Sequence, residues 1–183
     1  GTLKNPLYNM FLQAAHEGGY PLRPDLNDAE QEGCGPLPMT VANGVRASAA
    51  QAYLHPARQR NNLRIVCNAL SGRLLFHGAR AIGVEAMLGN RTARFYADQV
   101  IVCAGAINTP QLLLLSGIGP ANELSALDIP VKLDLPGVGK NLMDHLEIYV
   151  QQACTQSLSL YKDLTLLGRA KIGLQWLSSR KGL

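Results

Sequence analysis

Asp144 and His145 are neighbours at the end of a glycine-rich segment, residues 135–145. A histidine beside an aspartate can act as a general base, because the carboxylate orients the imidazole and the imidazole titrates near neutral pH. The same pair can instead hold an irregular loop in place without any chemical role. The residues alone leave both interpretations open.

A second stretch that could do chemistry is residues 99–119, QVIVCAGAINTPQLLLLSGIG. Its apolar run at 100–104 lacks alternation and is rich in β-branched residues, which predicts a strand buried on both faces. Thr109 can cap a following helix, and Pro110 suits its first turn. The Ser-Gly pair at 116–117 predicts the end of that helix.

A buried strand that leads through small residues into a helix N-terminus can receive a nucleotide or a flavin. The free N–H groups and the helix dipole then face the ligand's phosphates. The alternative is an ordinary packing corner, in which small residues only allow the strand and the helix to approach each other. The motif by itself does not separate these two interpretations.

The cysteines and histidines give no sign of a metal site. They do not fall at zinc-ligand spacings, and no C-x-x-C pair is present. Cys67 and Cys103 lie in apolar runs, so we expect them to be reduced core residues, which favours a reducing compartment. The other two cysteines are Cys34 and Cys154.

Composition predicts a globular protein. The 183 residues are 47% hydrophobic and 16% charged, and the formal net charge is +4. The basic residues are scattered, apart from a locally basic end, so the sequence lacks a nucleic-acid-binding pattern. We expect no signal peptide and no membrane-spanning helix, so any membrane association would be peripheral.

The elements that must position these residues follow from periodicity and turn signals. We expect a helix over 6–17 capped by Asn5, a long loop over 20–40, and a helix over 48–60 that opens with a Ser48/Gln51 capping box and kinks or breaks near Pro56. Short strands with turns between them predict an antiparallel meander. Its strands would be 63–67, 73–77, 81–88 and 92–97, with turns at 71–72, 77–78 and 89–90. Further elements would be a helix over 120–127, a short extended piece over 131–133, a strand over 147–154 and helical structure from 158.

Several motifs at fixed spacing resemble the glucose–methanol–choline (GMC) family of flavin oxidoreductases. Gly105-Ala106, Thr109-Pro110, Leu113-Leu114 and the residues at 116–119 resemble the second signature of that family. The segments that lie in register with this signature are 43–48 upstream and 135–139 and 141–145 downstream. The resemblance covers essentially the whole chain.

The resemblance implies a mixed α/β fold. Residues 41–152 would form the central part of a Rossmann-like FAD-binding domain that carries an antiparallel meander. Residues 1–40 and 153–183 would be pieces of the substrate-binding domain. The family's G-x-G-x-x-G fingerprint and its catalytic histidine have no counterpart in the sequence, so we expect this chain to be a central fragment of a longer enzyme.

The resemblance also implies a cofactor site for FAD and no catalytic residue in this chain. We expect four residues at the end of the 100–104 run and the start of the next helix to line the flavin close to its ribityl phosphate. We expect Ser71 to correspond to the adenine-contact position, and three residues of the glycine-rich segment to lie where the two domains meet. These groups are Ala104, Gly105, Ala106 and Asn108; Ser71; and Asn141, Asp144 and His145. Since the family's catalytic histidine lies elsewhere, we favour the structural interpretation of the Asp144–His145 pair.

For the intact enzyme the resemblance implies oxidation of a small alcohol, with choline as the candidate substrate and hydride transfer to flavin N5. Its location would be cytoplasmic or membrane-associated, at the mitochondrial inner membrane in a eukaryote. Two alternatives stay open: a non-catalytic binding or structural domain, and a family member that acts on another primary alcohol. Because the 100–104 strand would otherwise expose an apolar edge, we expect self-association of the fragment, a rearranged edge, or cover from a longer chain.

Overall fold

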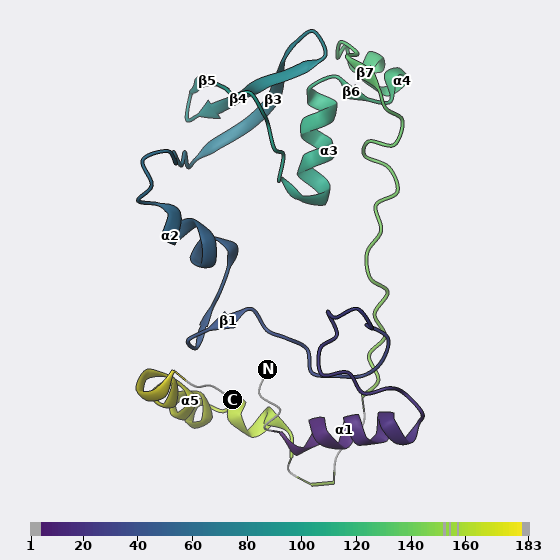
Figure 1. Ribbon diagram of the computed structural model, residues 1–183, viewed down its shortest axis with the longest axis vertical. Coiled ribbons are helices and arrows are strands. Elements are labelled where there is room, and N and C mark those ends of the chain that lie inside the picture. The colour runs from purple at the N-terminus through teal and green to yellow at the C-terminus, as the bar shows by residue number, and fades with distance from the viewer. Residues whose placement is uncertain (1–4, 152, 154, 157, 181–183) are drawn as a thin grey trace. The chain divides into compact units, whose positions relative to one another are not determined.

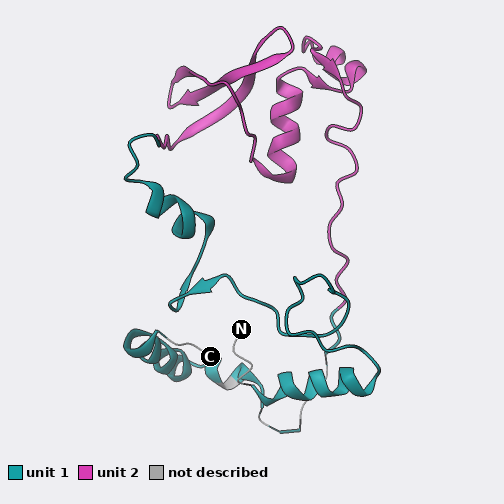
Figure 2. Cartoon of the chain, viewed as in Figure 1, with its two compact units in different colours: residues 1–63, 149–183 teal, residues 64–148 magenta. Residues whose placement is uncertain are grey.

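The chain forms two units, shown in Figure 2. The computed structural model describes residues 5–151, 153, 155–156 and 158–180 (Figure 1). One unit combines Gly1–Leu63 with Tyr149–Leu183, and the other is Arg64–Ile148. The first unit therefore joins the two ends of the chain, and the second holds the signature stretch. The assignment of residues 41–152 to a cofactor domain stays a prediction.

The first helix of the terminal unit, α1 (Pro6–Glu17), begins where the sequence predicts. Asn5 Oδ1 accepts a hydrogen bond from the Leu7 N–H at 2.9 Å, which satisfies one of the free donors of the first turn. Pro6 takes the first helical position, where no intrahelical donor is lost. Gly18 follows as the C-cap, so the predicted boundaries are confirmed.

The next part of this unit is a short hairpin followed by a widened helical turn. Strands β1 (Val41–Ala42) and β2 (Val45–Arg46) pair antiparallel. The π-helix η1 (Ala50–Leu54) then leads into α2 (His55–Ala57). The Ser48 hydroxyl accepts the Gln51 N–H at 3.2 Å, as predicted for the capping box. The π turn precedes Pro56, whose ring and missing N–H are incompatible with a regular α-helical turn.

The C-terminal part of the same unit is helical, as the sequence predicts. The 3₁₀-helix η2 (Leu160–Leu164) precedes α5 (Leu166–Ser179), and Thr165 caps α5 by accepting the Gly168 N–H at 3.2 Å. Trp176 Nε1 donates to the Gly44 carbonyl oxygen at 2.7 Å and so ties α5 to the β1–β2 hairpin. The predicted strand over 147–154 is wrong for residues 147–151, which form no strand, and Gln152 and Cys154 lie outside the described residues.

The second unit contains the predicted antiparallel meander, visible at the top of Figure 1. Its strands, in the order β3-β4-β5, are β3 (Ala69–His77), β4 (Arg80–Leu88) and β5 (Arg91–Tyr96). Gly78 and Gly89 lie in the two turns with φ of 57° and 60°, a left-handed backbone that glycine adopts without steric cost. The two predicted turns at these glycines are confirmed.

Two details of the predicted meander are wrong. Residues 63–67 form no strand, because no described segment pairs with them. Residues 71–72 are not a turn. They lie inside β3, where the pairing with β4 shifts register between Ser71 and Arg73. Gly72 supplies the extra residue of this bulge, a common use of glycine inside a strand.

A row of three charged side chains, one from each strand, links the strands of the meander. Glu85 Oε1 lies 2.8 Å from Arg73 Nε on β3, and Glu85 Oε2 lies 2.8 Å from Arg94 Nε on β5. These hydrogen bonds, to Arg73 first and then to Arg94, lower the pKa of Glu85 below its ordinary value. The three side chains join directly opposite residues of neighbouring strands.

The remaining elements follow the meander in the chain, and the first of them contacts the edge strand β3. They are α3 (Gly105–Leu115), β6 (Ile118–Gly119), α4 (Ala121–Ala126) and β7 (Leu133–Asp134), with β6 and β7 parallel. The buried apolar residues of this unit are Leu74, Ala86, Leu112 and Leu124. The helix predicted over 120–127 is confirmed, and of the extended piece predicted over 131–133 only Leu133 lies in a strand, β7.

The run at 100–104, predicted to be a buried strand, forms no strand and is unpaired among the described residues. Ile101 is 76% exposed, and Cys67 and Cys103 are exposed free thiols, so their predicted core positions are wrong. An apolar strand is buried only when neighbouring strands cover it, and the described chain supplies none here. The predicted fold class, mixed α/β with an antiparallel meander, is confirmed. None of the described helices is long and apolar enough to cross a membrane.

Candidate functional site

The N-terminal end of α3 brings together four of the predicted site residues: Ala104, Gly105, Ala106 and Asn108. All four are exposed. Ala104 occupies the N-cap position and provides no side-chain cap, so no side chain claims the free N–H groups of the first turn. Such an end favours a negatively charged group, because unpaired donors and the helix dipole point the same way.

Gly105 is the first residue of α3 and directly follows the irregular run at 100–104. Gly105 has φ of 83°, and a Cβ atom at this position would meet open space rather than protein atoms. The predicted cap at Thr109 is wrong, since Thr109 and Pro110 lie within α3. Pro110 leaves the carbonyl group of Ala106 without an intrahelical donor, which is tolerated because Ala106 is exposed.

The other predicted site residues are distributed over the unit. Ser71 lies in β3, is exposed and pairs with Ala86 across the sheet. Asn141, Asp144 and His145 lie in an exposed coil that follows β7, and Asn141 adopts a left-handed φ of 55°. The cofactor roles predicted for these residues stay predictions.

The Asp144–His145 pair forms a local backbone contact. Asp144 Oδ1 accepts a hydrogen bond from the backbone N–H of His145 at 2.8 Å. Aspartate side chains commonly stabilise turns through such bonds. This described segment shows no bond between the Asp144 carboxylate and the His145 imidazole, and the structural interpretation of the pair stays a prediction.

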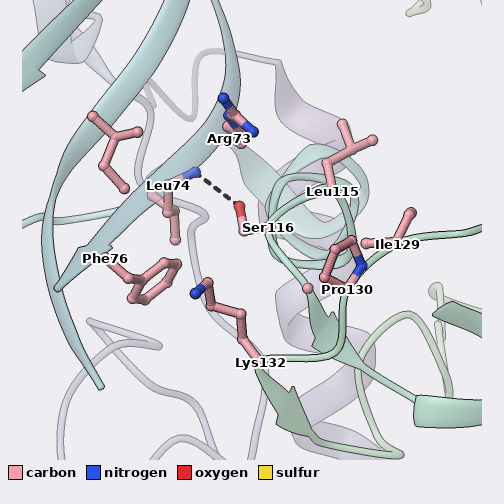
Figure 3. Close-up of a pocket in the computed structure, with 10 residues that line it drawn as sticks. Arg73, Leu74, Phe76, Leu115, Ser116, Ile129, Pro130 and Lys132 are labelled. Atoms are coloured by element: carbon pink, nitrogen blue, oxygen red, sulfur yellow. Dashed lines mark hydrogen bonds between the residues drawn. The ribbon is translucent and has the colours of Figure 1, made fainter. Parts of the chain in front are cut away.

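The C-terminal end of α3 contains a polar contact that sequence reasoning did not find. Ser116 is 7% exposed, and its hydroxyl group donates to the Leu112 carbonyl oxygen at 2.5 Å. The Ser116 Oγ atom also accepts a hydrogen bond from the Leu74 N–H on the free edge of β3 at 2.8 Å, which is the dashed line in Figure 3. Ser116 therefore joins helix to sheet. The sequence signal was a single serine after an apolar helix, which indicated only that the helix ends.

A metal centre has no support in the part of the chain that the structure describes. No group of three or more histidine, cysteine, aspartate or glutamate side chains lies close enough together to hold an ion. The candidate site is the uncapped N-terminal end of α3, which is lined by small residues and suits an anionic group.

Comparison with known proteins identifies the family. A family model described as GMC oxidoreductase matches residues 1–147. The chain belongs to the GMC oxidoreductase family. The resemblance read from the signature at 105–119 is thereby confirmed, and the uncapped end of α3 is the start of that signature.

Individual GMC relatives are similar along the whole chain. A mitochondrial choline dehydrogenase of Mus musculus is 51% identical over 183 residues, which is 100% of this chain and 31% of the relative. An oxygen-dependent choline dehydrogenase of Pseudomonas fluorescens is 49% identical over 98% of the chain and 32% of the relative. Among solved structures, an FAD-dependent oxidoreductase from Chaetomium thermophilum matches with a TM-score of 0.80 at 31% identity, over 97% of this chain and 32% of that one. The chain thus spans about a third of the length of these proteins.

Proposed function

We propose that this GMC chain is the central part of an FAD-dependent alcohol oxidoreductase that oxidises choline to betaine aldehyde. The observation that carries the proposal is the 51% and 49% identity, over nearly the whole chain, to proteins named choline dehydrogenase from a mammal and a bacterium. Identity at this level extends through both units rather than through the signature alone. The substrate assignment rests on these relatives.

The residues at the start of α3 fit an FAD phosphate group. The first-turn N–H groups are uncapped, and Ala104, Gly105 and Ala106 present only small side chains around them. A Cβ atom at Gly105 would project into open space, so the absence of a side chain there leaves room for close approach. This combination of free donors and small residues is what a cofactor phosphate requires.

In the proposed enzyme this chain would bind and orient the cofactor. The first-turn amides of α3 would donate to phosphate oxygens, and Ala104 and Ala106 would allow contact along the ribityl chain. Asn108, one turn along, would offer an amide to the same region. When bound, FAD supplies the chemistry of accepting a hydride from the alcohol carbon. No residue of this chain is assigned the proton transfer.

The proposal is tested on the full-length protein that contains this chain. We expect the purified protein to show flavin absorbance and to turn over choline faster than other primary alcohols at equal concentration. Turnover of other alcohols without choline would overturn the substrate assignment and leave the flavoenzyme assignment standing. A protein with neither flavin nor turnover would support the non-catalytic alternative.

Peripheral membrane association and self-association of the fragment are separate proposals. The first is suggested by the mitochondrial relative, and the second by the unpaired apolar run at 100–104. Release from membranes by high salt or alkaline carbonate would support a peripheral association. Sedimentation of the 183-residue chain over a range of concentrations would test whether it associates with itself.

A further inference from the structure

A pocket of about 220 Å³ lies at the C-terminal end of α3, between that helix and the edge strand β3 (Figure 3). Most of its wall is apolar and consists of Leu74, Phe76, Leu115, Ile129 and Pro130. Pockets that hold drug-sized molecules are commonly larger than about 300 Å³. The volume therefore suits a small ligand with one apolar group.

The charge around the pocket is positive. Its ten lining residues include Arg73 and Lys132 and, in this described part of the chain, no carboxylate. The two cations are not equivalent, because Arg73 already binds Glu85 at 2.8 Å. Lys132 forms no ion pair with a described residue, and its Nζ lies 5.7 Å from the centroid of the Phe76 ring. In Figure 3 the ammonium group points along the pocket toward Phe76.

The remaining polar side chain of the pocket is already satisfied. The Ser116 hydroxyl donates to Leu112 and accepts from Leu74, so it has little capacity to bind a ligand. Lys132 is then the group free to recognise a polar partner. A lysine ammonium has three donors and no acceptor, so its natural partner is an anion.

We infer that this pocket binds a small organic monoanion, a carboxylate joined to one apolar group. The carboxylate lies on the Lys132 ammonium, and the apolar group packs against Phe76, Leu115 and Ile129. Each half of the ligand has its own contact: the apolar wall receives the apolar group, and the lysine distinguishes the acid from its neutral analogue.

This site is separate from the proposed cofactor phosphate site. The two lie at opposite ends of α3, whose 11 residues span about 16 Å at 1.5 Å per residue. A ligand in the pocket would therefore leave the uncapped N–H groups at the start of α3 free. The inference does not depend on which alcohol the protein oxidises.

Calorimetric titration of the full-length protein with benzoate tests the inference, with benzyl alcohol as the neutral analogue. We expect benzoate to bind, benzyl alcohol to bind at least about tenfold more weakly, and Lys132→Gln to weaken benzoate binding at least about tenfold, since a charge-assisted hydrogen bond is lost. Lys132→Arg keeps the charge and should remain within about threefold of the wild type. The matched control is Lys140→Gln, because Lys140 lies outside the pocket and pairs with Glu123 at 2.6 Å.

Three results would overturn the inference. The first is absence of benzoate binding to the wild type at millimolar concentrations. The second is equal benzoate affinity of the wild type and Lys132→Gln, which would place any binding at another site, the alcohol site included. The third is an equal loss in Lys132→Gln and Lys140→Gln, which would indicate a general charge effect. Equal melting temperatures of the variants check that each is folded.

Discussion

Replacing Ser116 by alanine would remove the hydroxyl group that joins α3 to the edge of the meander. In the wild type this oxygen donates to Leu112 and accepts the backbone N–H of Leu74, and both Ser116 and Leu74 are buried. After the substitution the Leu74 N–H has no acceptor, and little water can reach it. The Leu112 carbonyl group loses one donor at the same time.

The expected cost follows from the burial of these groups. A buried donor left without a partner costs about 1–3 kcal/mol, whereas an exposed one would be solvated at almost no cost. The residual volume of one hydroxyl group is too small to add a large cavity term. The free energy of unfolding should therefore fall by about 1–3 kcal/mol, and the melting temperature should fall with it.

Thermal melting and amide hydrogen exchange measure this effect in the full-length protein. The matched control is Ser125→Ala in α4, an exposed serine whose replacement should change stability by less than about 0.5 kcal/mol. We also expect the Leu74 amide to exchange faster in Ser116→Ala only. If Ser116→Ala and Ser125→Ala have the same melting temperature and the Leu74 amide keeps its protection from exchange, the Ser116 hydroxyl group does not hold α3 to the meander.

Three further predictions concern other contacts. Glu85→Gln should lower the melting temperature at pH 7. Because the pKa of Glu85 in the folded state lies below 4.5, the difference in stability from the wild type should be complete above pH 4.5 and should shrink as the pH falls through that folded-state pKa. A difference that does not change with pH would contradict the pairing with the two arginines. Gly105→Val should reduce the flavin content of the full-length protein, because a β-branched residue disfavours φ of 83°. The control Gly137→Ala, at an ordinary φ with open space around it, should keep the flavin content. Equal flavin spectra of the two variants would count against a cofactor site at the start of α3. Trp176→Phe should lower the free energy of unfolding by about 0.5–1.5 kcal/mol, because it removes the hydrogen bond to Gly44. Urea unfolding measures this, and an unchanged midpoint would show that the bond contributes nothing to stability.

The isolated 183-residue chain provides a test of the fragment interpretation. We expect it to bind FAD weakly or not at all, because the sequence contains no G-x-G-x-x-G fingerprint for the pyrophosphate. Absorbance of the purified chain after incubation with FAD and desalting measures this directly. A yellow chain that retains stoichiometric flavin would contradict the prediction.

Local signals predicted the parts of the fold that depend on neighbours in sequence. Asn5 and Pro6 start α1, and Gly78 and Gly89 turn the meander, because capping and left-handed turns are decided by a few adjacent residues. The same holds for the end of α3 at Ser116. The family signature was equally readable, since it depends only on residue types at fixed spacing.

The errors fall where an element needs a distant partner. The apolar runs at 63–67 and 100–104 have strand composition but remain unpaired among the described residues, because propensity cannot supply neighbouring strands. Thr109 and Pro110 looked like a helix start, yet the left-handed backbone at Gly105 lets α3 begin earlier and absorb them. Residues 71–72 looked like a turn, but the register with β4 makes them a bulge.

The sequence by itself determined the family and the fold class, since both follow from residue types at fixed spacing. Tertiary structure alone decided the contacts between segments far apart in the chain. It placed Ser116 against the free edge of β3 and Lys132 over Phe76, and it set Glu85 between two arginines. The physical reason is that burial and pairing depend on which surfaces meet, and residue spacing along the chain does not encode those meetings directly.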